Sequence, residues 1–129
     1  MRMAWLYSRQ TTIGEPTLLP DNTHSLRLFI TEGDKHEGKP LYEWLARKAQ
    51  ELGLAGATVT RAIEGFGPQH TMRTTKILDL STNLPVIIEI IDQLDKIDNF
   101  LATVDSAVEC GLATIQKVDV RFYRAHKKV

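Results

Sequence analysis

The sequence has little cysteine, no excess of charge of either sign and no long hydrophobic run. Cys110 is the only cysteine in 129 residues, so a disulfide within the chain and a metal site made only of cysteines are excluded. The 16 basic residues balance the 16 acidic ones, so no net field draws the chain to nucleic acid or to an anionic membrane. No segment approaches the length of a membrane span, and residues 1–22 lack the apolar run of a signal peptide. We therefore expect a cytoplasmic protein that does not bind nucleic acid.

The length allows one domain with a single hydrophobic core, flanked by two segments of different character. Residues 1–25 contain prolines and threonines without a sustained period, which predicts an N-terminal extension with a short strand or hairpin near Met3–Arg9. Residues 26–123 carry the regular patterns of the domain, and residues 124–129 form a basic tail. Cys110 stands near the end of an apolar helical segment, where we expect it to pack as a small buried residue.

Hydrophobic periodicity predicts alternating strands and helices in the order β-α-β-β-α-β. Apolar side chains recur at three- and four-residue steps in two segments, and glycines that favour a helix end, Gly53 and Gly111, follow them. The first helix is expected to begin at Pro40, because proline suits the first turn. The expected elements are strand 26–30, helix 40–52, strand 57–63, a segment of strand character at 76–80, strand 86–92, helix 94–108 and strand 113–122.

This order, with right-handed crossovers, predicts an α+β ferredoxin-like sandwich, in which two helices cover one face of a four-stranded antiparallel sheet. Strand 86–92 is apolar on both faces, because only Glu89 interrupts the second one. The chain has no second helical layer, so we expect another subunit to cover that face. The N-terminal extension is the competing cover. At such an interface we expect Glu89 to pair with Arg or Lys of another subunit.

The same topology brings three loops to one edge of the sheet. Segments 33–39 and 65–70 follow strands that run parallel to each other, and the turn near residues 110–112 opens at that edge too. The polar residues brought together in this way are Asp34, Lys35, His36, Glu37, Lys39, Gln69, His70 and Arg73.

The segment GDKHEGKP, residues 33–40, has the glycine and lysine spacing of a phosphate-binding P-loop. Pro40 stands where that loop requires Ser or Thr to hold Mg²⁺, and Asp34 and Glu37 would repel phosphates. A glycine-containing segment that opens a helix still presents free backbone N–H groups, which favour an anion. The segment therefore contributes four candidate ligand-binding residues, Lys35, His36, Gly38 and Lys39.

Metal binding and catalysis are two further hypotheses for this edge. His36 and Glu37, with Asp34 and His70, have side chains that suit zinc or a similar ion. The alternative interpretation is that His36 and Glu37 orient the loop and cap the helix, while His70 lies in a solvated loop. No Ser/His/Asp or Cys/His arrangement is discernible, so we expect a protein that is not an enzyme.

The stretch GLAGATVTRAIEGFGPQH, residues 53–70, resembles the part of PII nitrogen-signalling proteins that leads into their T-loop. The segments EGDKHEGKPLYEWL, IEGFG and LPVIIEIID resemble more closely the PII-like domain of unknown function 190 family, over residues 26–122. The resemblance implies a ferredoxin-like homotrimer whose sheets face inward. It also implies clefts between subunits, at the base of the T-loop, that bind adenine nucleotides, and a T-loop that contacts a target protein.

Carried over to this chain, the resemblance places Gly65, Gly67 and Gln69 at the nucleotide and matches Lys76 to a phosphate-contacting lysine. His70 and Arg73 belong to the same loop and complete the candidate ligand-binding residues. The loop 65–75 has no tyrosine, which argues against uridylylation. The turn ECGLATIQK, residues 109–117, lacks the basic, glycine-rich sequence that grips a triphosphate in PII proteins. AMP, ADP or another small anion therefore fits better than ATP.

These observations predict a non-enzymatic, PII-like sensor that binds a small anionic ligand and regulates a partner through loop 65–75. The family resemblance indicates a membrane transporter or channel as that partner. The first alternative is a divalent-metal-binding trimer similar to copper-tolerance proteins. The second is an enzyme that acts on a small anionic substrate in the same cleft.

Overall fold

The structure is a computed structural model that describes residues 21–75 and 83–126. The expected strand at Met3–Arg9, the segment 76–80 and the last three residues of the basic tail lie outside these ranges. In chain order the elements are β1 (Thr23–Thr31), β2 (Lys35–His36), β3 (Lys39–Pro40), α2 (Leu41–Glu51), β4 (Ala57–Arg61), β5 (Glu64–Gly65), β6 (Arg73–Thr74), β7 (Pro85–Gln93), α3 (Leu94–Val104), the 3₁₀ helix η1 (Asp105–Ala107) and β8 (Leu112–Lys117).

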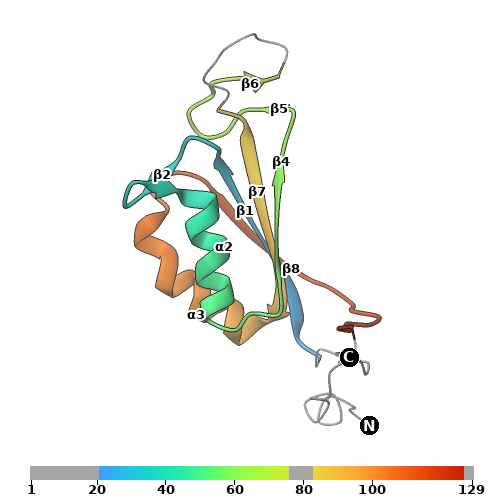
Figure 1. The fold of residues 1–129 in the computed structure, drawn as a ribbon. Coiled ribbons are helices and arrows are strands. Elements are labelled where there is room, and N and C mark those ends of the chain that lie inside the picture. The colour runs from blue at the N-terminus through green and yellow to red at the C-terminus, as the bar shows by residue number, and fades with distance from the viewer. Residues whose placement is uncertain (1–20, 76–82, 127–129) are drawn as a thin grey trace.

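The main sheet has four antiparallel strands in the order β4-β7-β1-β8. Helices α2 and α3 lie side by side on one face of it, as Figure 1 shows. This is the ferredoxin-like α+β arrangement predicted from the sequence. The short pairs β2–β3 and β5–β6 lie outside the main sheet, and β5–β6 projects beyond one end of it.

The core lies between the helices and one face of the two central strands. Side chains alternate along a strand, so every second residue of β7 is buried, beginning with Val86. On α2 and α3 the buried side chains recur at three- and four-residue steps, which places them on one stripe that faces the sheet. The buried apolar residues of these elements are Leu26, Leu28, Ile30, Leu41, Leu45, Ala49, Val86, Ile88, Ile90, Ile97, Phe100 and Val104.

The ends of both helices differ slightly from the expectation. Pro40 is the residue before α2 rather than its first helical residue, and Gly53, with φ of +75°, turns the chain out of the helix as predicted. Helix α3 ends at Val104, because η1 replaces its expected last turn. The backbone tightens there, and Cys110 is exposed rather than packed in the core. The expectation of a buried cysteine was wrong.

The last strand ends at Lys117, five residues before the expected end at Phe122. The backbone N–H of Val118 donates to the carbonyl of Thr23, the first residue of β1. Beyond that point β1 offers no further partner, so the ladder stops. Strand β4 likewise ends at Arg61 rather than at residue 63, because the chain turns into β5.

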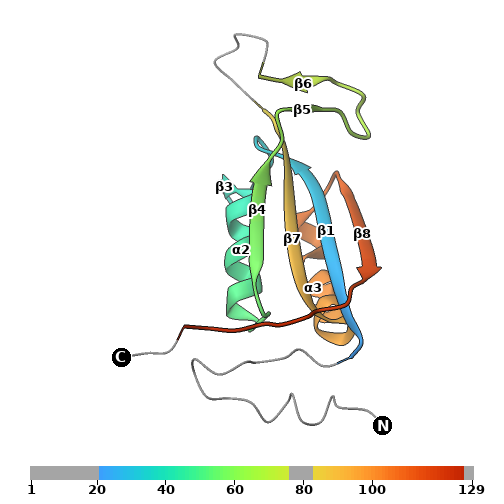
Figure 2. The same ribbon diagram turned by 90° about the vertical axis from the view of Figure 1, so that its right-hand side faces the viewer.

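Among residues 21–75 and 83–126, no helix lies on the second face of the main sheet, and only the segment after β8 crosses one end of it (Figure 2). Phe29, Ile87 and Ile91 are half-buried on this face. Glu89 lies among them, where it accepts hydrogen bonds from Ser25 and Arg27 of its own chain. Glu89 thus has an arginine partner within its own chain, on the neighbouring strand, and a further partner in another subunit stays a prediction. Coverage of this face by further subunits stays a prediction.

Candidate functional site

A cavity of about 460 Å³ lies at the end of the main sheet where β5 and β6 project. Its walls come from the end of β1, the loop between β5 and β6, and the turn before β8. Strand β1 pairs with β8 and sets Phe29 opposite Leu112, so the end of β1 lies beside the turn before β8. The lining residues are Phe29, Ile30, Thr31, Asp34, Phe66, Gly67, Pro68, Gln69, Arg73, Asn83, Cys110, Gly111 and Leu112.

Gly111 lets the turn before β8 approach the end of β1. Its φ is +152°, and a Cβ atom there would stand 2.6 Å from the carbonyl oxygen of Phe29. A side chain at this position would strain the backbone and push the turn away from β1. The cavity wall therefore depends on glycine at position 111.

The loop between β5 and β6 is held at its base by a few contacts. The hydroxyl of Thr74 donates to Glu64 over 2.9 Å, and the N–H of Thr75 donates to the carbonyl of Ile63 over 3.0 Å. A turn closes the far side, where the N–H of His70 bonds to the carbonyl of Gly67. Beneath this loop a second hollow of about 290 Å³ includes Gly65, Gly67, Gln69 and Arg73 in its lining.

Two charged side chains line the cavity of about 460 Å³. Asp34 is engaged, because its Oδ2 accepts the N–H of Thr31 over 2.9 Å. Arg73 is half-buried and forms no ion pair with any residue in the described ranges. The described lining thus presents one cation without an ion pair, an apolar wall at Phe29 and Phe66, and a residue without a side chain at Gly67. Such a combination suits a planar apolar group that carries a small negative charge.

The structure divides the predicted site residues into two groups. Gly67, Gln69 and Arg73 line the cavity, and Gly65 lines the hollow beneath it. The four residues predicted from GDKHEGKP, namely Lys35, His36, Gly38 and Lys39, lie in the β2–β3 turn and line neither space. His70 is exposed at the tip of the loop, and Lys76 lies outside the described residues.

The β2–β3 turn is built around aromatic packing. The rings of His36 and Trp44 stand 4.3 Å apart, and Nε2 of His36 is 3.5 Å from Glu37. The first N–H of α2, at Leu41, donates to the carbonyl of Asp34, so a backbone group already occupies it. No side chain caps α2. His36 and Glu37 therefore order the turn, as the alternative interpretation stated, but do not cap the helix.

Within residues 21–75 and 83–126, no three His, Cys, Asp or Glu side chains gather closely enough to hold a metal ion. His36 and Glu37 form only a pair, and His70 contacts Phe66 instead, with ring centroids 5.6 Å apart.

Several cavity residues were missed by the sequence analysis. Asn83 accepts the N–H of Gly33 and thereby ties the loop after β1 to the chain entering β7. Cys110 and Leu112 reach the cavity because β8 pairs with β1. The only sequence signal for them was the expected convergence of the turn 110–112 with the other loops.

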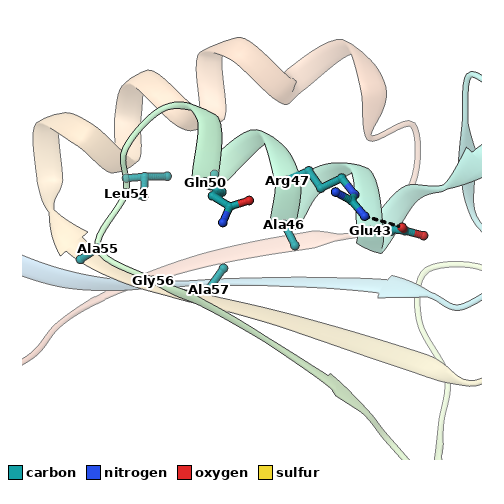
Figure 3. Close-up of a pocket in the computed structure, with 9 residues that line it drawn as sticks. Glu43, Ala46, Arg47, Gln50, Leu54, Ala55, Gly56 and Ala57 are labelled. Atoms are coloured by element: carbon teal, nitrogen blue, oxygen red, sulfur yellow. Dashed lines mark hydrogen bonds and ion pairs between the residues drawn. The ribbon is translucent and has the colours of Figure 1, made fainter. Parts of the chain in front are cut away.

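A larger hollow, of about 560 Å³, lies between α2 and the start of β4 (Figure 3). Small residues such as Ala46, Gly56 and Ala57 form much of its lining. Its one basic side chain, Arg47, points to Glu43, at 3.3 Å. Because this cation is already paired, the hollow is a weaker anion site than the cavity beside Arg73.

Glu89 lies on the open face of the sheet, where it pairs with Arg27. The hydrogen bond from Ser25, and then that from Arg27, lower the pKa of Glu89 below its ordinary value of 4.5, against a smaller opposing effect of burial. Glu89 is therefore ionised at neutral pH.

No helix among the described residues is long and apolar enough to cross a membrane.

Comparison with known proteins gives consistent matches of sequence and fold. Residues 23–120 match the DUF190 family, described as Uncharacterized ACR. A UPF0166 protein of Aquifex aeolicus is 44% identical over 95 residues, which cover 74% of this chain and 90% of that protein. A UPF0166 protein of Methanocaldococcus jannaschii is 38% identical over 76 residues, which cover 59% of this chain and 69% of that protein.

Two solved structures share the fold at low sequence identity. CPII, a nitrogen regulatory PII-like protein from Thiomonas intermedia bound to ADP, AMP and bicarbonate, superposes with a TM-score of 0.59 at 15% identity, covering 76% of this chain and 87% of CPII. A protein of Thermus thermophilus described as PII-like signaling superposes with a TM-score of 0.53 at 18% identity, covering 79% of this chain and 90% of that one. At these identities the likeness shows a PII-like fold.

Proposed function

Because the chain belongs to the DUF190 family and has a PII-like fold, we propose that it is a non-enzymatic sensor of a small adenine nucleotide. The nucleotide binds in the cavity formed by the end of β1, the β5–β6 loop and the turn before β8. Its binding changes the conformation of loop 65–75 and so the affinity for a partner protein. The observation that carries this proposal is the cavity itself, where Gly67, Gln69 and Arg73 converge with an apolar wall.

The chemistry of the walls favours a ligand with few phosphates. Among the described residues that line the cavity, Arg73 is the one cation without an ion pair, while Asp34 places a carboxylate in the same cavity. A triphosphate would lack cations to balance its charge, whereas AMP or ADP needs fewer. An adenine ring can pack on Phe29 or Phe66, since aromatic side chains stack well on flat rings. The PII-like neighbour CPII was solved with ADP and AMP, which supports this ligand class.

Loop 65–75 is suited to two conformations because only a short ladder joins its two ends in the described part of the chain. The β5–β6 ladder has two residue pairs, Glu64 with Thr74 and Gly65 with Arg73. A ligand that contacts Gln69 and Arg73 interacts differently with each arrangement of the loop, and it therefore shifts their populations. Phe66 and Met72, both exposed on this loop, form the surface offered to the partner. We propose a membrane transporter or channel in that role, from the family resemblance.

The protein acts as a homotrimer in this proposal. The open face of the sheet carries half-buried Phe29, Ile87 and Ile91, and none of the described helices lies on it. Three copies that turn this face inward would remove it from water. The cavity opens beside the sheet edge at Leu112, so a neighbouring subunit would stand next to the ligand.

Isothermal titration of the purified protein with AMP, ADP and ATP tests the proposal. We expect AMP and ADP to bind more tightly than ATP. Arg73→Gln should weaken AMP binding about tenfold, which corresponds to about 1.4 kcal/mol. The matched control is Arg47→Gln, which removes a cation from the hollow between α2 and β4 and should leave the affinity unchanged. Absence of binding by all three nucleotides, or equal losses in the two variants, would refute it.

A further inference from the structure

The two outer strands of the main sheet are exposed on both faces. The buried residues of the sheet all lie on the central strands β7 and β1, while every residue of β4 and of β8 is exposed, although α2 runs beside β4. On the helix side Val59 is 39% exposed and Ile115 is 41% exposed. Both belong to the core face, since Val59 pairs with buried Ile88 and Ile115 pairs with buried Leu26. Apolar residues on a core face are expected to be covered.

The directions of these strands allow one edge to pair with the other in a second copy. β4 and β8 stand at opposite ends of the sheet order and run antiparallel to each other (Figure 2). If copies are arranged about an axis parallel to the strands, β4 of one copy comes beside β8 of the next, still antiparallel. The alternation of strand directions continues across the boundary, and the ring closes without a free edge.

The side-chain pattern selects one register. Antiparallel partners share a face, so Val59 must stand opposite an odd-numbered residue of β8 to keep both core faces together. Only pairing with Ile115 uses all five residues of β4 within the bounds of β8. The resulting pairs are Ala57 with Lys117, Thr58 with Gln116, Val59 with Ile115, Thr60 with Thr114, and Arg61 with Ala113.

We propose that β4 of one copy pairs antiparallel with β8 of the next copy in this register. Val59 and Ile115 then cover each other on the helix side, and Thr60 meets Thr114 on the inner face, a favourable cross-strand pair. No like charges stand opposite, because the partners of Arg61 and Lys117 are both alanines. The inference rests on the homotrimer of the proposed function and adds to it which edges meet and which residues face each other.

This pairing completes the ligand cavity from the neighbouring copy. Continued past the end of β4, the register sets Ala62 and Ile63 beside Leu112 and Gly111 of the next copy. Ile63 is 76% exposed in the single chain, and the neighbour would cover it. The rim of each cavity, which includes Gly111 and Leu112, would thus meet the end of another copy's β4.

Cysteine cross-linking in a Cys110→Ser background tests the register. Two double variants are made: Thr60→Cys with Thr114→Cys, and Val59→Cys with Ile115→Cys. Each places two cysteines opposite each other across the proposed boundary. Because the two pairs are adjacent, one of them is a non-hydrogen-bonded pair, in which the Cα atoms are closer than in a hydrogen-bonded pair. Within one copy the two strands are three steps apart, about 14 Å, too far for a disulfide. Under mild oxidation we expect most chains of at least one variant to form covalent dimers and trimers in non-reducing gels.

The control pair, Thr58→Cys with Thr114→Cys, is displaced by two residues and should cross-link at least about fivefold less, because diagonal neighbours lie about 7–8 Å apart. Preferential linkage of the control pair, or linkage of any single-cysteine variant, would overturn the proposed register. AMP titration of the same proteins keeps this inference separate from the proposed function. Binding without the expected cross-links refutes the edge pairing alone, and cross-links without binding refute the nucleotide site alone.

Discussion

The hydroxyl of Ser25 donates a 2.9 Å hydrogen bond to Glu89 Oε2 across the two central strands, on the face of the sheet opposite α2 and α3. Arg27 donates to the same oxygen over 3.0 Å. These donors make the ionised carboxylate more stable in the folded protein than in the unfolded chain, and they lower the pKa of Glu89. An acidic residue in the middle of an apolar strand is therefore tolerated because its neighbours satisfy it.

The stability that Glu89 contributes should depend on pH. Because its folded pKa is lowered from 4.5, the contribution is present above that ordinary value and is lost as the pH falls through the folded pKa. Glu89→Gln should reduce the free energy of unfolding at pH 7 by less than about 1 kcal/mol, since the pair is partly exposed. Urea unfolding at pH 7 and pH 3 should show the difference from the wild type shrinking at the lower pH. A difference that is unchanged or larger at pH 3 would contradict this, with Glu43→Gln in α2 as the control.

Asp92 fastens the turn after α2 to the sheet. Its side chain is 1% exposed and accepts the N–H of Ala55 over 2.8 Å and the N–H of Gln93 over 2.6 Å. Asp92→Ala leaves both donors without this partner and should lower the free energy of unfolding by about 2 kcal/mol. Asp98→Ala, on the exposed side of α3, should change it by less than about 0.5 kcal/mol. Chemical denaturation measures both free energies of unfolding. Similar losses in the two variants would contradict the prediction that the hydrogen bonds of Asp92 stabilise the fold.

The strands were largely predictable because their side chains alternate and their pairing follows from topology. The apolar run of residues 86–92 predicts a strand, and β7 extends only one residue further at each end. The pattern of three- and four-residue steps predicts Leu101 on the core face of α3, between Ile97 and Val104, and leaves Phe100 out. The structure buries Phe100 completely and leaves Leu101 half-buried. The choice depends on the rotation of the helix against the sheet, which periodicity alone does not determine.

The candidate site was predictable to the extent that it depends on a single loop. Gly67, Gln69 and Arg73 follow one another in the sequence and were found there. Phe29 and Cys110 are 81 residues apart and come together only through the register of β1 with β8. The segment GDKHEGKP contributes only Asp34 to the lining of the cavity, because its other residues lie in or beside the β2–β3 turn. Ligand binding by Lys35, His36, Gly38 and Lys39 stays a prediction.

Gly111 should be intolerant of even the smallest side chain. A Cβ atom would lie 2.6 Å from the carbonyl oxygen of Phe29, and φ is +152°. Gly111→Ala should therefore cost about 1–3 kcal/mol of unfolding free energy and weaken AMP binding by displacing the cavity wall. Gly56→Ala is the matched control, because a Cβ there has no neighbour within 4 Å. The prediction fails if Gly111→Ala unfolds at the same denaturant concentration as Gly56→Ala.

Cys110 reports directly on occupancy of the cavity. Its thiol is exposed and it is among the cavity-lining residues, so the native protein should react fully with a colorimetric disulfide reagent such as DTNB. If AMP binds in this cavity and shields the thiol, a concentration of ten times Kd fills about 90% of the sites, and the initial rate should fall about tenfold. In Gln69→Ala the same AMP concentration should protect less, and in the urea-unfolded chain it should not protect at all. A full reaction rate at AMP concentrations that titration shows to be saturating would place the nucleotide elsewhere, because a ligand beside Gly67 and Gln69 blocks the approach to Cys110.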